Sequence, residues 1–106
     1  MKAKVVIPRE LARRDVDQAV EHYLVDGTFE AALHVVDALE RAYTRISRQP
    51  TSGSPRYAHE MNLNGLRSWP LARFPYMVLY FEHDDFIDVW RVLHSRRDIP
   101  AWMGEP

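Results

Sequence analysis

The spacing of apolar residues changes once along this chain, from a helical period before Asn64-Gly65 to an extended one after it. Before this turn dipeptide, apolar residues recur every three or four positions, which predicts helices over residues 8–26 and 28–48. After it, apolar runs broken by turn residues predict a three-stranded meander over residues 65–94. A short β-branched run predicts a further strand over residues 2–7. The predicted order is strand, two helices and three strands, an α+β fold with a helical hairpin on one face of an antiparallel sheet.

Length and composition limit the chain to one domain without a metal or a cofactor. With 106 residues it can form a single domain, in which residues 95–106 are expected to be a C-terminal tail. The absence of cysteine excludes disulfides and thiolate metal sites, and the five histidines lack metal-ligand spacing. No glycine-rich phosphate loop is present, so no cofactor is expected.

Charge and hydropathy argue against nucleic acid and membranes as direct partners. A net charge of -1 gives no broad basic field, so sequence-specific binding to nucleic acid is not expected. No apolar run approaches the ~20 residues of a membrane helix, and Pro8 interrupts the apolar start before a signal-peptide core is complete. The chain is therefore expected to be cytoplasmic.

The predicted sheet has more apolar surface than one helical hairpin can cover. The middle strand of the meander presents on one face Met77, Leu79 and Phe81 and is also apolar on the other face. In the last strand, strict alternation predicts that one face carries Ile87, Val89, Arg91 and Leu93. The uncovered face is expected to be shielded by residues 99–103 folding back, by a second copy of the chain, or by a different protein.

Three apolar residues of the second helix, Phe29, Leu33 and Ala38, lie outside its main apolar stripe. The short connection between the two helices predicts that they lie antiparallel as a hairpin. The three residues are then expected either to contact the first helix or to line a groove for a partner helix.

The strongest candidate for chemistry is a basic cluster at the end of the last strand. It consists of Arg91, His94, Arg96 and Arg97, with Arg67 and Arg73 expected nearby on the first strand of the meander. Arginines around one imidazole can hold a phosphodiester and move a proton, or they can pair with carboxylates of the chain and of an acidic partner protein. Binding is favoured because no second proton-transfer group accompanies His94. The carboxylates Asp84, Asp85 and Asp88 are expected to form a solvated turn.

Several segments together resemble one protein family. They are Ala12-x-x-Asp15-Val16, Gly53-Ser54-Pro55-Arg56, Gly65-Leu66-Arg67-Ser68-Trp69-Pro70, Arg73-Phe74-Pro75-Tyr76-x-Val78-x-Tyr80, and Asp88-Val89-Trp90-Arg91-Val92-Leu93-His94-x-x-Arg97-Asp98-Ile99-Pro100. This pattern resembles the ParE branch of the RelE/ParE toxins, also called plasmid stabilisation proteins, from about Pro8 to Met103.

The resemblance implies the toxin of a type II toxin-antitoxin system that inhibits DNA gyrase by binding, without catalysis. It also implies a ribbon-helix-helix, ParD-like antitoxin that wraps an extended or helical segment around the toxin, and leaves open oligomers of the toxin with itself or with the antitoxin. Candidate residues for contact with the target or the antitoxin are Arg91, His94, Arg96, Arg97, Met77, Leu79, Phe81 and Trp102.

The alternative implied by the resemblance is a RelE-like, ribosome-dependent mRNA endonuclease on the same fold. In that case Arg67, Arg73 and Arg91 would hold the phosphate and His94 would act as acid or base. The sequence departs from that pattern because no tyrosine follows Tyr80 and both lysines precede the first helix. Arg9 also stands where many relatives have a helix-capping serine. A third reading is a decayed toxin that still folds with its antitoxin.

Overall fold

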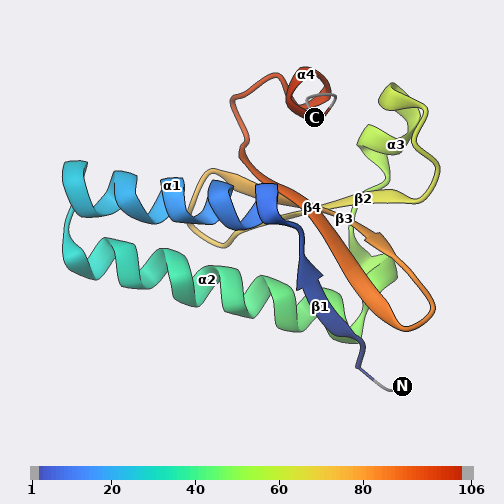
Figure 1. Cartoon of the computed structure of the whole chain (residues 1–106), viewed down its shortest axis with the longest axis horizontal. Helices are drawn as coiled ribbons and strands as arrows, with labels where there is room; N and C mark the ends of the chain where they lie inside the picture. Colours follow the sequence, from blue (N-terminus) through green and yellow to red (C-terminus); the bar gives the residue numbers. More distant parts are fainter. Residues whose placement is uncertain (1–2, 104–106) are drawn as a thin grey trace.

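The computed structural model describes residues 3–103 and contains one four-stranded sheet in the order β1-β4-β3-β2 (Figure 1). The strands are β1 (Val5–Pro8), β2 (Leu66–Pro70), β3 (Tyr76–Glu82) and β4 (Phe86–His94). β1 pairs parallel with β4, and the other neighbours pair antiparallel. The fold is therefore α+β, as the change of period predicts, with a mixed rather than a wholly antiparallel sheet. Residue 2 of the predicted first strand and residues 104–106 of the predicted tail lie outside the described residues.

Two long helices, α1 (Glu10–Asp26) and α2 (Phe29–Arg48), form an antiparallel hairpin whose turn end extends past the sheet (Figure 1). Thr28 caps α2, because its hydroxyl accepts a hydrogen bond from the Ala31 N–H at 3.0 Å. Pro8 does not begin α1, since it pairs with Val89 as the last residue of β1. The first helix consequently begins two residues later than the predicted range.

The first hydrophobic core lies between this hairpin and one face of the sheet. It contains buried residues of both helices and of β3 and β4, among them Ala12, Leu39, Ile46, Val78, Tyr80 and Val89. Their relative exposure is 8% or less, so the part of the hairpin that lies over the sheet buries its apolar side against it.

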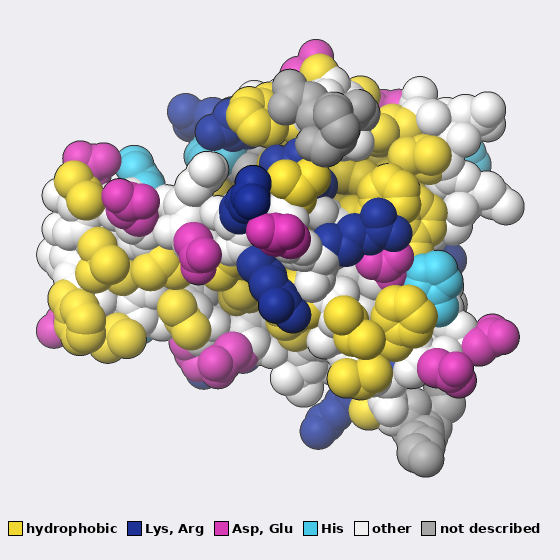
Figure 2. Space-filling model, in the orientation of Figure 1, with side chains coloured by type: hydrophobic (Ala, Val, Ile, Leu, Met, Phe, Trp, Pro, Cys, Tyr) yellow, Lys and Arg dark blue, Asp and Glu magenta, His cyan; other side chains and the backbone are white. Residues whose placement is uncertain are grey.

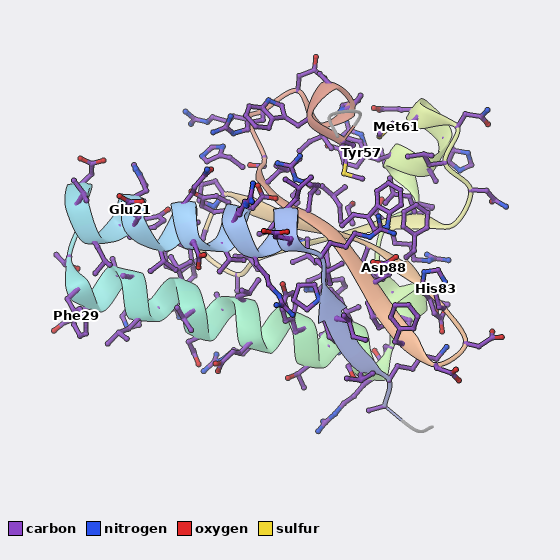
Figure 3. All side chains as sticks on the ribbon, in the orientation of Figure 1. Glu21, Phe29, Tyr57, Met61, His83 and Asp88 are labelled. Carbon is purple, nitrogen blue, oxygen red and sulfur yellow. The ribbon has the colours of Figure 1, made fainter. Side chains whose placement is uncertain are left out.

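The second face of the sheet is covered by the chain itself. A six-residue helix, α3 (Arg56–Met61), and a five-residue helix, α4 (Ile99–Met103), lie over it and form a second core, with Tyr57 and Met61 on the sheet side (Figure 3). The core contains Tyr57, Leu66, Leu79, Leu93, Ile99 and Met103. Of the three expected occupants, the fold-back of residues 99–103 is therefore the one observed. α3 is an element that the sequence pattern does not predict.

A β-bulge in β4 changes which side chains share a face. Leu79 pairs with Arg91 and Tyr80 pairs with Val89, so Trp90 has no partner on β3. Ile87 and Val89 consequently belong to the first core, whereas Leu93 belongs to the second. The prediction that one face carries Ile87, Val89, Arg91 and Leu93 is therefore wrong, because strict alternation does not survive the extra residue.

Both side edges of the sheet are partly occupied. On β2, the Ser68 N–H and C=O exchange hydrogen bonds with Ser54, and Pro70 has no N–H to donate. On the β1 side, the Lys4 N–H donates to the Ser47 carbonyl at the end of α2. In the part of the chain that the structure describes, no helix is long and apolar enough to cross a membrane.

Candidate functional site

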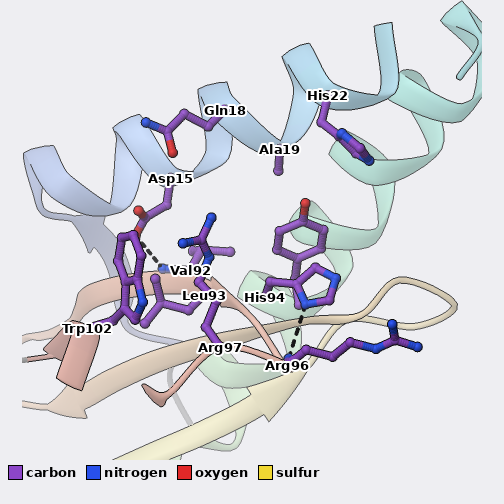
Figure 4. Close-up of a pocket in the computed structure, with 11 residues that line it drawn as sticks. Asp15, Gln18, Ala19, His22, Val92, Leu93, His94, Arg96, Arg97 and Trp102 are labelled. Carbon is purple, nitrogen blue, oxygen red and sulfur yellow. Dashed lines mark hydrogen bonds between the residues drawn. The ribbon is translucent and has the colours of Figure 1, made fainter. Parts of the chain in front are cut away.

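A pocket of about 430 Å³ opens between α1, the end of β4 and α4 (Figure 4). Three consecutive parts of the chain meet in it: the last residues of β4, the loop that follows, and α4. Four of the predicted site residues line it, namely His94, Arg96, Arg97 and Trp102. α1 supplies the opposite wall with Asp15, Gln18, Ala19 and His22.

The base of this pocket is a buried ion pair between α1 and β4. Arg91 donates from Nε and Nη2 to the two carboxylate oxygens of Asp15 at 2.8 and 2.9 Å. Both residues are at most 9% exposed, and Arg91 Nη1 also donates to the Trp102 carbonyl at 2.9 Å. Arg91 therefore joins α1, β4 and α4, and its charge is balanced inside the protein.

Asp15 lies there because β1 ends before β4 does. β1 pairs with β4 only as far as Val89, so beyond that residue β4 has β3 on one side and no strand on the other. The Asp15 carboxylate accepts the Val92 N–H at 3.0 Å and satisfies this buried donor. Asp15 therefore meets Arg91 at the edge of β4 that lies beyond the end of β1.

His94 is fixed at the other end of the pocket. Its ring packs edge-on against Tyr76 with centroids 5.3 Å apart, and its Nδ1 accepts the Arg96 N–H at 3.1 Å. Burial lowers the pKa of His94, and the positive charges of Arg96, Arg97 and His22 lower it further. The imidazole is consequently neutral near pH 7.

The pocket as a whole favours anionic groups. The Arg97 guanidinium lies over the Trp102 ring, 4.0 Å from its centroid, and Arg96 is exposed at the rim (Figure 4). Asp15, the one carboxylate among the lining residues, is already bound to Arg91 and Val92. Among the described residues, no group of three or more acidic, histidine or cysteine side chains is arranged to hold a metal ion.

A comparison with protein-family models finds one match, to the ParE toxin of the type II toxin-antitoxin system parDE, over residues 6–99. The chain belongs to the ParE toxin family. It is thus the toxin of a type II toxin-antitoxin system, and an antitoxin is its partner.

The fold of this ParE toxin is also found among solved structures. A chain from the chromosomal ParDE toxin-antitoxin system of P. aeruginosa superposes with a TM-score of 0.74 at 20% sequence identity. The match covers 89% of this toxin and 98% of that chain. A search of curated proteins found no significant match.

Other predicted residues of the ParE toxin lie away from the pocket. Arg67 lies on β2, which β3 separates from β4, and it donates to the carbonyls of Thr51 and Gly53 at 3.1 and 2.8 Å. Arg73 is exposed in the β2–β3 loop with a φ of 70° and is not part of the pocket lining. The expected convergence of Arg67, Arg73, Arg91 and His94 is therefore not observed.

The three predicted residues on β3 of the toxin are mostly enclosed. Leu79, a candidate for contact with a partner, is completely buried in the second core and has no surface to offer in this conformation. Met77 and Phe81 are half-buried at its margin. Only they retain surface that a partner can contact in this conformation.

Asp88 also departs from its expected place in a solvated turn. It is 7% exposed and accepts from Arg9 at 2.9 and 3.0 Å, from Trp90 at 3.1 Å, and lies 3.2 Å from His83 Nε2 (Figure 3). Arg9, which stands in place of a capping serine, is thus used for an ion pair.

Sequence reasoning did not single out Gln18 and His22, and included Asp15 only within a motif. Asp15 carries a signal that points to it: it lies three residues after Ala12 and four before Ala19, on the buried side of α1. A carboxylate on the buried side of a helix needs a cation or several N–H donors. His22 and Gln18 are exposed polar residues on an amphipathic helix and carry no such signal.

Proposed function

We propose that this ParE toxin inhibits DNA gyrase by binding it, without catalysing a reaction, and that the pocket formed by His94, Arg96, Arg97 and Trp102 contributes to the contact. The observation that carries this proposal is the Asp15–Arg91 ion pair, which occupies one of the three arginines that the nuclease alternative assigns to the phosphate. Two exposed arginines beside an aromatic ring remain, and they suit recognition of acidic groups on a protein.

A supercoiling assay with purified gyrase tests the proposal. Wild-type toxin at micromolar excess is expected to inhibit supercoiling, and Arg96→Glu is expected to weaken inhibition by about tenfold through like-charge repulsion. Arg48→Glu, the same charge change at an exposed position of α2, is the matched control and is expected to inhibit like wild type. Supercoiling that is unaffected by wild-type toxin contradicts the proposal.

We further propose that the antitoxin is a ribbon-helix-helix, ParD-like protein whose acidic side chains enter the same pocket. The excess of positive charge among the lining residues supports this choice of chemistry. In pull-down experiments with the product of the neighbouring reading frame, Arg96→Glu is expected to weaken capture and Arg48→Glu to leave it unchanged. Equal capture of both variants places the antitoxin elsewhere.

Ribosome-dependent cleavage of mRNA is the second candidate, and the position of His94 favours it. A neutral imidazole next to Arg96 and Arg97 can accept a proton near a phosphate once its Nδ1 gives up the hydrogen bond from the Arg96 N–H. If His94 is the base, cleavage in a translating extract increases with pH through a midpoint below 6.5, the ordinary value, and is lost in His94→Ala. Absence of cleavage by wild-type toxin excludes this candidate.

A further inference from the structure

Charge is unevenly distributed along the chain. Between residues 15 and 40 there are seven Asp or Glu and no Lys or Arg, although the whole chain contains fifteen and fourteen of these, respectively. Residues 15–40 comprise most of α1, the turn and the first part of α2. The hairpin is therefore strongly acidic, and the rest of the molecule has a compensating positive excess.

The turn end of the same hairpin carries an exposed apolar patch. We call it the tip patch, and it consists of Leu24, Val25, Phe29 and Leu33. Their relative exposures are 49%, 72%, 68% and 52%, and they are four of the six exposed large hydrophobic residues in the described chain. Figure 2 shows yellow side chains gathered at this end of the hairpin, and Figure 3 places Phe29 at the tip. Exposed apolar residues that cluster in this way mark interaction sites.

The tip patch decides between the two alternatives for the outlying residues of α2. Ala38 is buried at 7% exposure, whereas Phe29 and Leu33 do not become buried against α1. The two exposed residues are four positions apart and so lie on one side of α2, next to the end of α1. Apolar side chains at this spacing across two antiparallel helices form the kind of surface on which an amphipathic helix docks.

The border of the tip patch is acidic. Glu21 and Asp26 on α1 and Glu30 and Asp37 on α2 are exposed on the same turns as the apolar side chains (Figure 3 labels Glu21). The first arginine beyond them on α2, Arg41, lies 3.2 Å from Asp37 and is thereby engaged. An occupant of the patch must therefore approach through a negative field.

We propose that the tip patch is a docking surface for a helical segment of a partner protein that has apolar residues on one side and Lys or Arg beside them. The acidic border complements such a helix and repels nucleic acid and anionic lipid surfaces. It also disfavours a symmetric pair of this chain, because a two-fold contact at the patch would place the same carboxylates opposite each other. This surface is distinct from the pocket, whose charge is of the opposite sign.

Two synthetic peptides test the proposal directly. One is an amphipathic helix of about five turns (~18 residues) with leucines flanked by lysines, and the other has glutamates in place of the lysines. In titrations of isotope-labelled toxin followed by NMR, the lysine peptide is expected to shift amides within residues 21–37 and to bind about tenfold more tightly than the glutamate peptide. Equal affinity of the two peptides, no binding, or shifts confined to other residues overturns the proposal.

Variants with matched exposure complete the test. Phe29→Ser combined with Leu33→Ser is expected to reduce affinity for the lysine peptide by about tenfold, since both side chains are exposed anchors. Val5→Ser combined with Ile7→Ser removes apolar side chains of 61% and 45% exposure at β1 and is expected to leave the affinity for the lysine peptide unchanged. Sedimentation of the free toxin is expected to show a monomer. A dimer that the Phe29 and Leu33 substitutions abolish would assign the patch to a second copy and overturn the proposal.

Discussion

At the scale of single residues, the Asp15 carboxylate joins α1 to β4. It accepts from two nitrogens of Arg91 and from the Val92 N–H, all within 3.0 Å. A buried ion pair adds little net stability against an apolar alternative, but loss of one partner leaves an uncompensated charge. The pair therefore fixes the geometry of the pocket base more than it adds to stability.

Asp15→Asn is expected to lower the free energy of unfolding by about 3–5 kcal/mol, because it removes the negative charge that balances buried Arg91. Chemical denaturation measures this change. Asp17→Asn, two residues along α1 at an exposed position, is the control, and its free energy of unfolding is expected to stay within about 0.5 kcal/mol of wild type. Equal stability of the two variants would show that the Arg91 charge finds compensation elsewhere.

Asp88 makes stability depend on pH in the acid range. Burial raises its pKa, but hydrogen bonds from Arg9, His83 and Trp90 together outweigh burial, so the pKa lies below its ordinary 3.8. The folded protein therefore binds this proton less readily than the unfolded chain, and the stabilisation is present above the ordinary pKa.

As the pH falls from 6, the free energy of unfolding of wild-type toxin is expected to decrease more than that of Asp88→Asn. The difference begins near pH 4, the ordinary pKa, and is complete below the lower pKa of the folded state. Thermal unfolding at a series of pH values gives both curves. Asp85→Asn, in the exposed β3–β4 turn, is expected to follow wild type. Parallel curves for wild type and Asp88→Asn would show that this carboxyl titrates alike in both states.

At the scale of elements, a buried hydroxyl helps to hold the segment between α2 and α3 against the sheet, together with the hydrogen bonds from Arg67 and Ser68. Tyr80, on β3, has 0% exposure and donates from its hydroxyl to the Pro50 carbonyl at 2.6 Å. Gly53 passes close to the same side chain, so that a Cβ there would collide with the hydroxyl and come within 3.0 Å of the adjoining ring carbon. The glycine is required for close approach rather than for an unusual φ.

Gly53→Ala is expected to destabilise the toxin by about 1–3 kcal/mol through overpacking. Tyr80→Phe alone is expected to cost about 1–2 kcal/mol because the Pro50 carbonyl loses its donor. In the double variant the collision with the hydroxyl is absent, so a double-mutant cycle measured by denaturation is expected to show less than the sum of the two losses. Simple additivity would mean that the ring, rather than the hydroxyl, limits the space at Gly53.

Elements with many repeats of their period could be predicted from the sequence, whereas short elements and single irregularities could not. α2 spans 20 residues, and its stripe and the Thr28 cap both identify it. α3 has only six residues, too few for a helical repeat of apolar residues to be recognised in the sequence. The bulge at Trp90 cannot be recognised from the composition of β4, yet beyond it Val92 faces the first core and Leu93 faces the second.

The candidate site was predictable only in part for a related reason. His94, Arg96, Arg97 and Trp102 are close in sequence, and the end of β4 brings them together. Whether Arg67 lies near these residues depends on the order of the strands in the sheet, and no local sequence pattern specifies that order. β3 lies between β2 and β4, so Arg67 is separated from the pocket by a whole strand.

At the scale of the whole molecule, two cores lie on opposite faces of one sheet, and they differ in how they are covered. The first is covered by helices of 17 and 20 residues, the second by helices of six and five residues. Short helices contribute few contacts, so the second core is expected to open locally at lower free energy than the first.

Ile99→Ala combined with Met103→Ala is expected to release α4 and expose Leu79 and Leu93, because both side chains are nearly buried in the second core. Binding of a hydrophobic dye is expected to increase while most helical circular dichroism remains. Ala101→Ser, at an exposed position of α4, is the control. Cooperative loss of all helical signal at once would instead make the two cores a single unit of stability.

The partly occupied side edges of the sheet affect how copies of this protein behave at high concentration. The unpaired backbone groups of an open edge strand can pair with the same strand of another copy, and repeated addition in this way forms fibrils. Here Ser54 and Pro70 obstruct one side, while a four-residue strand tied to Ser47 ends the other. Fibril growth by strand addition is thus obstructed at both edges of the sheet, although the chain also exposes the apolar tip patch.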